Sequence, residues 1–217
     1  FRASEKFDKQ VGAVAAWLRR AEVEATAVEC EPFDKQGFTK ELQSLRSLTC
    51  EPNPEQFIPE LKKRCARHGV AVVFIAAPSG CPASGATKWL GSEKAMLVLS
   101  LRYKTNDHLW FTFFHEVGHL LKHGKRMFFI EGLEGLDLEA EEQANRFARD
   151  LLIPPSSLQA LYDLSRKPYL SKQDVADFAR SIHVAPGIVV GRMQHEDWLP
   201  QSHMNKLKER YQWAASN

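Results

Sequence analysis

The spacing of hydrophobic residues changes along the 217-residue chain and marks different kinds of secondary structure. In the first third, apolar positions recur at helical spacing, as in the stripe formed by Val11, Val14, Ala15, Trp17 and Leu18. Residues 38–48 and 55–68 continue the helical pattern, the second behind Pro54 and closed by Gly69. The sequence therefore predicts a helical N-terminal part over residues 1–68.

Strand patterns follow this helical part. Residues 70–75 form a continuous run of β-branched and aromatic side chains, which is typical of a buried strand. Residues 85–90 and 95–101 are predicted as two further strands, separated by a turn at Gly91 and Ser92. We expect these strands to form a small antiparallel or mixed sheet.

A strongly apolar helix is predicted next, with Asp107 as its N-cap and Gly124 as its stop. Residues 125–130 are predicted as an edge strand. Residues 138–152 have the pattern of an amphipathic helix ended by two prolines, and residues 156–164 that of a further helix. With the preceding strands, these elements would make up a core domain covering residues 69–165.

Residues 166–217 are predicted to form a helical subdomain packed on this core. Within it, residues 174–182 and 188–194 read as two short helices around a tight turn, the arrangement of a helix-turn-helix. The second helix is rich in apolar residues that are typical of a protein core, namely Ile188, Val189, Val190 and Met193. Packing is therefore the favoured interpretation, and a C-terminal DNA-binding helix-turn-helix is the weaker alternative.

Composition narrows the class of protein. Hydrophobic residues make up 44% of the chain and charged residues 26%, the balance of an ordinary globular protein. The net charge is +2, from 29 basic and 27 acidic residues, so no global positive field indicates DNA binding by this chain. The apolar runs are short, no signal segment opens the chain, and the four cysteines lack metal-site spacing. We expect a cytoplasmic protein with no membrane partner and reduced cysteines.

The candidate chemistry lies in the apolar helix, at the sequence His-Glu-Val-Gly-His. His115 and His119 are four residues apart, which places both imidazoles on one helix face within reach of one cation. Glu116 stands beside them, where it could accept a proton from a water that a zinc ion makes more acidic. A solvated polar face is the alternative, but the surrounding phenylalanines and leucines predict a buried helix. Buried imidazoles need partners, and a metal ion supplies one.

A peptidase zinc needs a third protein ligand. His123 continues the same helix, but it lies about 12 Å along the axis from His115, too far for one ion. It is better placed as a helix C-terminal cation or as a second-sphere group. On the next helix, Glu141 could bind the metal while Asn145, one turn on, hydrogen-bonds and orients a ligand. The alternative is that the acidic residues 139–142 form only a solvated helix start.

Three residues are candidates for stabilising an oxyanion during hydrolysis. They are Tyr103, His108 and His123. The sequence does not choose among them, because each could equally have a structural hydrogen-bonding role.

These motifs resemble the ImmA/IrrE family of zinc metallo-endopeptidases. The resemblance covers residues 99–155 and rests on the HEVGH helix, on the run 141–148 with its Glu-x-x-Ala-Asn pattern, and on the Leu-Leu-Ile-Pro at 151–154. It implies a zincin-like α+β fold and makes the first Glu of that pattern, Glu141, the third zinc ligand. Gln143 stands where many relatives have an acid.

The flanking segments resemble C-terminal domains of HigA-type antitoxin regulators. The segments are Trp17-Leu18-Arg19-Arg20, Gly85-Ala86-Thr87-Lys88-Trp89 and Gly187-Ile188-Val189-Val190-Gly191-Arg192. Such proteins carry an Xre-type helix-turn-helix ahead of the peptidase-like domain, and this chain opens at Phe1 without Met, so we expect a piece of a longer protein.

The expected function is that of a zinc-dependent endopeptidase domain of a transcriptional or antitoxin regulator. It would hydrolyse a peptide bond in a protein partner such as a repressor, and DNA would be bound only through a helix-turn-helix module outside this chain. A non-catalytic sensing or partner-binding domain is the alternative. The presence of Glu116 argues against it, since a structural metal site has no need of a base.

Overall fold

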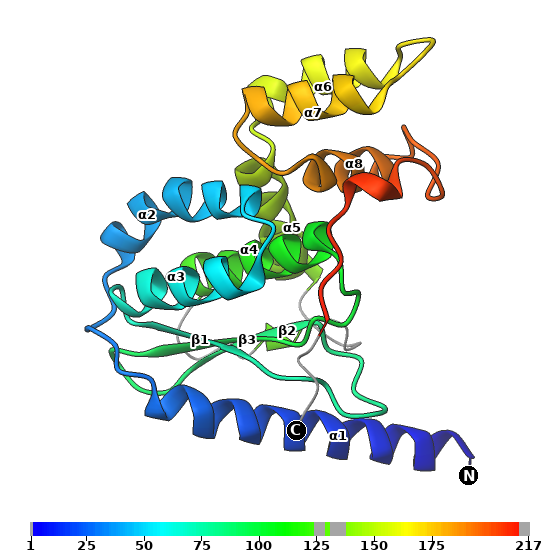
Figure 1. Ribbon diagram of the computed structural model, residues 1–217. Helices are drawn as coiled ribbons and strands as arrows, with labels where there is room; N and C mark the ends of the chain where they lie inside the picture. The colour runs from blue at the N-terminus through cyan, green and yellow to red at the C-terminus, as the bar shows by residue number, and fades with distance from the viewer. Residues whose placement is uncertain (1, 124–128, 131–137, 213–217) are drawn as a thin grey trace.

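A small sheet separates the long helix α1 from a layer of other helices in the computed structural model (Figure 1). The structure describes residues 2–123, 129–130 and 138–212. Within them the chain is α+β, and two histidines and a glutamate meet on neighbouring helices. The predicted zincin-like α+β fold is confirmed.

The sheet is mixed. Its strands are β1 (Val70–Phe74), β2 (Gly85–Trp89), β3 (Ala95–Leu99) and β4 (Phe129–Ile130), in the order β1-β3-β2-β4. β1 is parallel to β3, whereas β2 is antiparallel to both β3 and β4. The turn predicted between the second and third strands thus forms a hairpin, and β4 lies at the predicted edge.

Successive side chains of each strand point to opposite faces of the sheet. On β1, Ala71 and Val73 face α1 (Arg2–Ala27), while Val70 and Val72 face the other helices. Both faces are buried, so the strand reads as a continuous apolar run and not as an alternating one. This explains why residues 70–75 could be recognised from sequence.

The buried stripe of α1 packs along the sheet. Its members recur at helical spacing: Val14, Trp17, Ala21 and Ala25. The Trp17 indole N–H donates a hydrogen bond of 2.9 Å to the Ile75 carbonyl, so the one polar group of this buried ring has a partner. None of the described helices, α1 included, has the length and apolar character needed to cross a bilayer.

The helices α2 (Lys35–Ser47) and α3 (Pro54–Ala66) lie on the opposite side of the sheet from α1 (Figure 1). Both begin earlier than predicted because side chains cap them. The Asp34 carboxylate accepts from backbone N–H groups at the start of α2, and Asn53 does so for α3. Cys30, Cys50, Cys65 and Cys81 form no disulfide with one another.

The helix α4 (Asn106–Lys122) runs through the centre of the molecule (Figure 1). Its apolar residues extend around most of its circumference, the pattern of a helix enclosed by other elements. Trp110, Phe113 and Phe114 are each fully buried. A buried side chain of this size contributes roughly 1.5–3 kcal/mol through the apolar area withdrawn from water. The rigid position of α4 in the core is what fixes the site.

The helix α5 (Leu138–Leu152) crosses α4 at close range, and its bounds are those predicted. Gly118 makes the approach feasible, since a Cβ atom there would lie 3.1 Å from the Ala144 Cα and 3.3 Å from its carbonyl oxygen. A larger residue would push the two backbones apart. The contact brings the first turn of α5 against the histidine face of α4.

The C-terminal helices are α6 (Leu158–Ser165), α7 (Lys172–Ser181) and α8 (Pro186–His195). A capping box formed by Ser171 and Asp174 starts α7. The apolar residues of α8 are buried in the same core as α4, namely Ile188, Val189, Val190 and Met193. The favoured packing of the second helix of the candidate helix-turn-helix is therefore what the structure shows.

The predicted start of α4 is wrong, and its predicted stop lies outside the described residues. Asp107 is not the N-cap of α4: Thr105 occupies that position, and its side chain makes no capping hydrogen bond. The physical reason is a backbone bridge between Thr105 and Arg210, which fixes the helix start, while the Asp107 carboxylate pairs with Lys208 Nζ at 2.5 Å. The predicted stop at Gly124 and residues 125–128 of the predicted edge strand lie outside the described residues.

Candidate metal centre

Two imidazoles from one face of α4 form the first half of the site. His115 and His119 lie one helical turn apart, and their Nε2 atoms are separated by 2.9 Å. Both residues are almost completely buried, with 1% of each residue exposed. Two ring nitrogens held this close in the core are disposed to share one cation.

Glu141, from the first turn of α5, completes the cluster. Its Oε2 lies 3.3 Å from His115 Nε2, and its Oε1 lies 3.2 Å from His119 Nε2. Two imidazole nitrogens and a carboxylate oxygen all lie within 4.8 Å of one another. Ligands of a tetrahedral zinc at about 2.0–2.1 Å from the ion are about 3.3 Å apart, so the donor set fits such an ion. Three protein ligands would leave the fourth position of such an ion for water.

The protonation states of these groups suit metal binding. Burial acts to raise the pKa of Glu141, but hydrogen bonds from His115 and His119 outweigh it and hold that pKa at about 2. Burial lowers the pKa of His119, and the neighbouring Glu141 carboxylate offsets only part of this effect. The carboxylate is therefore ionised and the imidazole tends to be neutral, which are the forms that bind a metal ion.

Asn145 lies directly behind His115. Its Oδ1 is 2.9 Å from Nδ1 of the imidazole. In the tautomer that binds a metal ion, the ring carries its proton on Nδ1; that N–H donates to the amide oxygen and leaves the Nε2 lone pair for the ion. This is the contact through which Asn145 was predicted to orient a ligand.

His123 lies at the end of α4, as its C-cap residue. Its Nε2 is 3.2 Å from the Ala140 carbonyl oxygen, and its ring centroid is 5.3 Å from that of His119. It lies outside the cluster of three donor atoms. The structure thus places His123 beside the site and not in it. This agrees with the helix-rise estimate, which put His123 too far from His115 to share one ion.

Glu116 is fully buried, and a residue of the sheet holds its carboxylate in place. The Thr87 hydroxyl on β2 donates a 2.7 Å hydrogen bond to Glu116 Oε2 and also contacts the Glu116 carbonyl oxygen at 3.3 Å. Gly85, on the same strand, gives the carboxylate room, because a Cβ there would lie 2.9 Å from Glu116 Cγ. Sequence reasoning missed both residues. The only available signal was that both belong to the segment 85–89, which resembles the HigA-type regulators.

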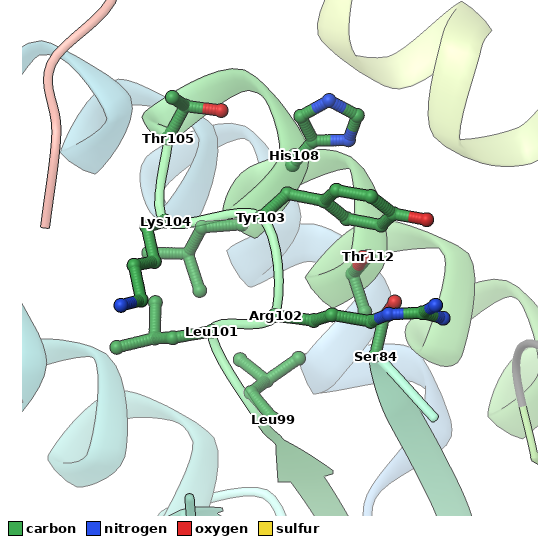
Figure 2. Close-up of a pocket in the computed structure, with 10 residues that line it drawn as sticks. Ser84, Leu99, Leu101, Arg102, Tyr103, Lys104, Thr105, His108 and Thr112 are labelled. Carbon is green, nitrogen blue, oxygen red and sulfur yellow. The ribbon is translucent and has the colours of Figure 1, made fainter. Parts of the chain in front are cut away.

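Two of the three candidate oxyanion residues, Tyr103 and His108, lie together at the start of α4. Figure 2 shows the Tyr103 ring beside the His108 ring, and the two stack with centroids 4.4 Å apart. Tyr103 is half exposed, and the pocket drawn around it has a volume of about 10 Å³, but both residues also line a larger cavity of about 580 Å³. Neither residue belongs to the cluster of metal-binding groups. Their role in stabilising an oxyanion stays a prediction.

Gln143, the residue that departs from the family pattern, is exposed on α5. Its side-chain amide donates to Glu139 Oε1 at 3.1 Å. The departure therefore falls on the outer face of the helix and leaves the three clustered groups unchanged.

The α+β fold, the paired histidines and the glutamate from the following helix together define a metallopeptidase-type domain. A comparison with family models agrees: the model described as the IrrE N-terminal-like domain, a peptidase family, matches residues 65–189. The chain belongs to this family. A comparison with curated proteins finds no match.

Proposed function

We propose that the protein is a zinc-dependent endopeptidase domain of a transcriptional or antitoxin regulator, and that it hydrolyses a peptide bond in a protein partner. The observation that carries the proposal is the buried cluster of His115, His119 and Glu141, whose donor atoms lie within 4.8 Å of one another. Glu116, next to one of these ligands in the sequence, supports catalysis over a purely structural site.

The division of labour among the residues follows from their contacts. His115, His119 and Glu141 would hold the ion, which when bound supplies a Lewis acid for the scissile carbonyl and acidifies a water molecule. Glu116 accepts the proton of the attacking water and delivers it to the leaving amine. Thr87 fixes one oxygen of Glu116, and Asn145 fixes the ring of His115.

The biological context is the finer part of the proposal. The resemblance of the flanking segments to HigA-type regulators supports a protein substrate, such as a repressor or a toxin–antitoxin partner, and an action in the cytoplasm. The low net charge of +2 supports a separate helix-turn-helix module as the DNA-binding part. Hydrolysis of one regulator would convert a signal into a change of transcription.

Metal analysis combined with cleavage tests the proposal. The purified chain should contain about one zinc ion, and the zinc-loaded chain should create new termini in a proteome-derived peptide library read by mass spectrometry. Glu116→Gln is the matched control. It should keep the zinc and the fold but lose cleavage, because the amide preserves shape and cannot take the proton.

The same measurements identify the alternative function. Cleavage that continues in Glu116→Gln would show that Glu116 is not the base. If the metal-loaded wild-type chain cleaves no peptide and Glu116→Gln behaves in the same way, the protein is a sensing or partner-binding domain instead.

A further inference from the structure

A cavity of about 580 Å³ opens between α4, α5 and α8. It begins beside the candidate metal centre, because Asn145, whose Oδ1 lies 2.9 Å from His115 Nδ1, is part of its lining. From there it extends to Gly191, Arg192 and His195 on α8. A cavity of this size can hold several side chains of a polypeptide.

The cavity is displaced from the metal along both helices. Arg149, in its lining, lies just over two turns beyond Glu141 on α5, about 12 Å along the helix axis. His108 lies about 10 Å before His115 on α4. An extended chain advances about 3.3–3.6 Å per residue, so the far end of the cavity is about three residues from a peptide bond at the metal. The cavity is therefore suited to select a side chain near the reacting bond.

Two arginines face this cavity from different helices. Among the described residues, Arg149 makes one hydrogen bond, from Nη2 to Glu142 Oε1 at 2.5 Å. Arg192 likewise makes one, from Nε to Glu196 Oε1 at 2.7 Å, and its buried Nη1 has no hydrogen-bond partner in the described part of the chain. A guanidinium has five N–H donors, so most donors of both residues remain unused.

The lining offers fewer free acceptors than free donors. Asp107 Oδ2 is paired with Lys208 Nζ at 2.5 Å and Glu142 is already paired with Arg149, while Asp107 Oδ1 is buried and has no hydrogen-bond partner in the described part of the chain. The two arginine side chains are only 23% and 13% exposed, so bulk water reaches them poorly. A group rich in acceptors is what this end of the cavity lacks, and a carboxylate matches the fork of a guanidinium best.

Apolar side chains form another part of the cavity wall. They include Phe111, Ile153 and Ile188. An aliphatic stem can lie along such a wall while its charged head reaches the arginines. The combination fits the side chain of an acidic residue better than it fits a free inorganic anion, which would gain nothing from the apolar wall.

We propose that this cavity binds a carboxylate of the polypeptide substrate, two to four residues from the scissile bond, through Arg192 and Arg149. The inference rests on the proposed peptidase function and adds the substrate chemistry to it. The family model matches residues 65–189, so Gly191, Arg192 and His195 lie outside the matched range. The C-terminal helix α8 thus contributes to the selectivity of the cavity.

The test measures binding and does not depend on hydrolysis. The full chain carrying Glu116→Gln is loaded with zinc and titrated into fluorescent peptide mixtures, in which one position is fixed and the others are randomised. Mixtures fixed as Asp or Glu should bind at least about tenfold more tightly than those fixed as Asn or Gln. Each mixture is made with a free and with an amidated C-terminus, which separates an internal acidic side chain from a chain end as the source of the carboxylate.

Variants assign the preference to the cavity. Adding Arg192→Gln should abolish the preference for acidic peptides. Arg149→Gln changes the more exposed arginine and should reduce the preference. This second variant also tests the site if Arg192→Gln fails to fold. Arg180→Gln, on the exposed surface of α7 with its side chain 72% exposed, is the matched control and should leave the preference unchanged.

Each outcome has a defined meaning. No peptide binding, binding that depends on neither an acidic residue nor a free C-terminus, or a preference that survives both cavity substitutions would overturn the carboxylate site. Binding that weakens on amidation but is equal for Asp or Glu and for Asn or Gln would place a chain end in the cavity, whereas an acidic preference insensitive to amidation supports an internal residue. A wild-type chain that cleaves no peptide while the preference persists would remove the peptidase function and leave the binding site standing.

Discussion

The Thr87 hydroxyl donates a 2.7 Å hydrogen bond to Oε2 of Glu116, between strand β2 and the centre of helix α4. Both groups are buried, so the bond exists in surroundings where an unpaired carboxylate oxygen would be costly. It holds one oxygen of the candidate base and thereby limits rotation of the carboxylate. Thr87 is a positioning residue for Glu116, acting from an element distant in the sequence.

Replacing Thr87 should therefore affect turnover and leave metal binding intact. Thr87→Val keeps the shape and the strand preference but removes the donor, and we expect kcat to fall by about tenfold to a hundredfold, the range of a hydrogen bond to a charged group. KM and the zinc content should hardly change. Steady-state kinetics on a cleaved peptide, together with metal analysis, check this.

Thr87→Ser is the matched control for this prediction. It restores the hydroxyl and should recover most of the lost kcat. Equal rates for the valine variant and the wild type, or equal losses for valine and serine, would show that the hydrogen bond does not position the base.

The sequence predicts those parts of the site that depend on helix periodicity. His115 and His119 share a face because they are four residues apart, and the bounds of α5 follow from its apolar stripe and the prolines after it. Glu141 could be selected because its helix offered Asn145 one turn on, and the family resemblance agreed. Local spacing is encoded in the chain itself.

The remaining features depend on contacts between distant segments. Thr87 reaches Glu116 only because β2 lies against α4, and no local pattern specifies that alignment. Asp107 looked like an N-cap because its pairing with Lys208, far along the chain, could not be seen. The close approach of Gly118 to Ala144 is likewise a property of two packed helices. Such relationships are set by tertiary packing, which one sequence without a structure does not reveal.

Glu141 and His123 should differ sharply in their importance for the metal. Glu141→Ala removes one of three clustered donors and should weaken zinc binding severely, whereas His123→Ala changes a group outside the cluster. We expect the second loss to remain within about tenfold to a hundredfold, the range for groups that act through a ligand. Competition titrations with a zinc chelator compare the two variants directly. Equal losses would show that His123 is a ligand and that α4 bends in solution.

Replacing a helical glycine by alanine should have opposite effects on stability at two positions, because only one of them lies at the crossing of α4 and α5. Gly12→Ala, in α1, adds a Cβ that meets no atom within 4 Å beyond its chain neighbours and the nearby backbone of its own helix, and should stabilise the protein by up to about 1 kcal/mol through helix propensity. Gly118→Ala adds the same atom 3.1 Å from the Ala144 Cα and should destabilise by about 1–3 kcal/mol, because the two helices must separate. Chemical denaturation measures both changes. Stabilisation by Gly118→Ala would show that the contact between α4 and α5 can accommodate the added Cβ without strain.

The buried face of α8 leads to a prediction about DNA. To enter a major groove, the second helix of the candidate helix-turn-helix would have to expose side chains for reading bases. Ile188, Val189, Val190 and Met193 are instead at most 4% exposed, and the net charge of the chain is only +2. We therefore expect this chain alone to show no tight or sequence-selective binding to DNA.

An electrophoretic mobility shift at low salt decides this point, because contacts to phosphates are strongest there. A DNA-binding helix-turn-helix protein of similar size provides the positive control for the conditions. Weak binding that disappears as salt is raised would reflect scattered surface lysines and arginines and would agree with the prediction. Tight, sequence-selective binding by residues 1–217 would contradict it, since α8 would then have to leave the core that buries it, and the region 174–194 would regain a DNA-reading role.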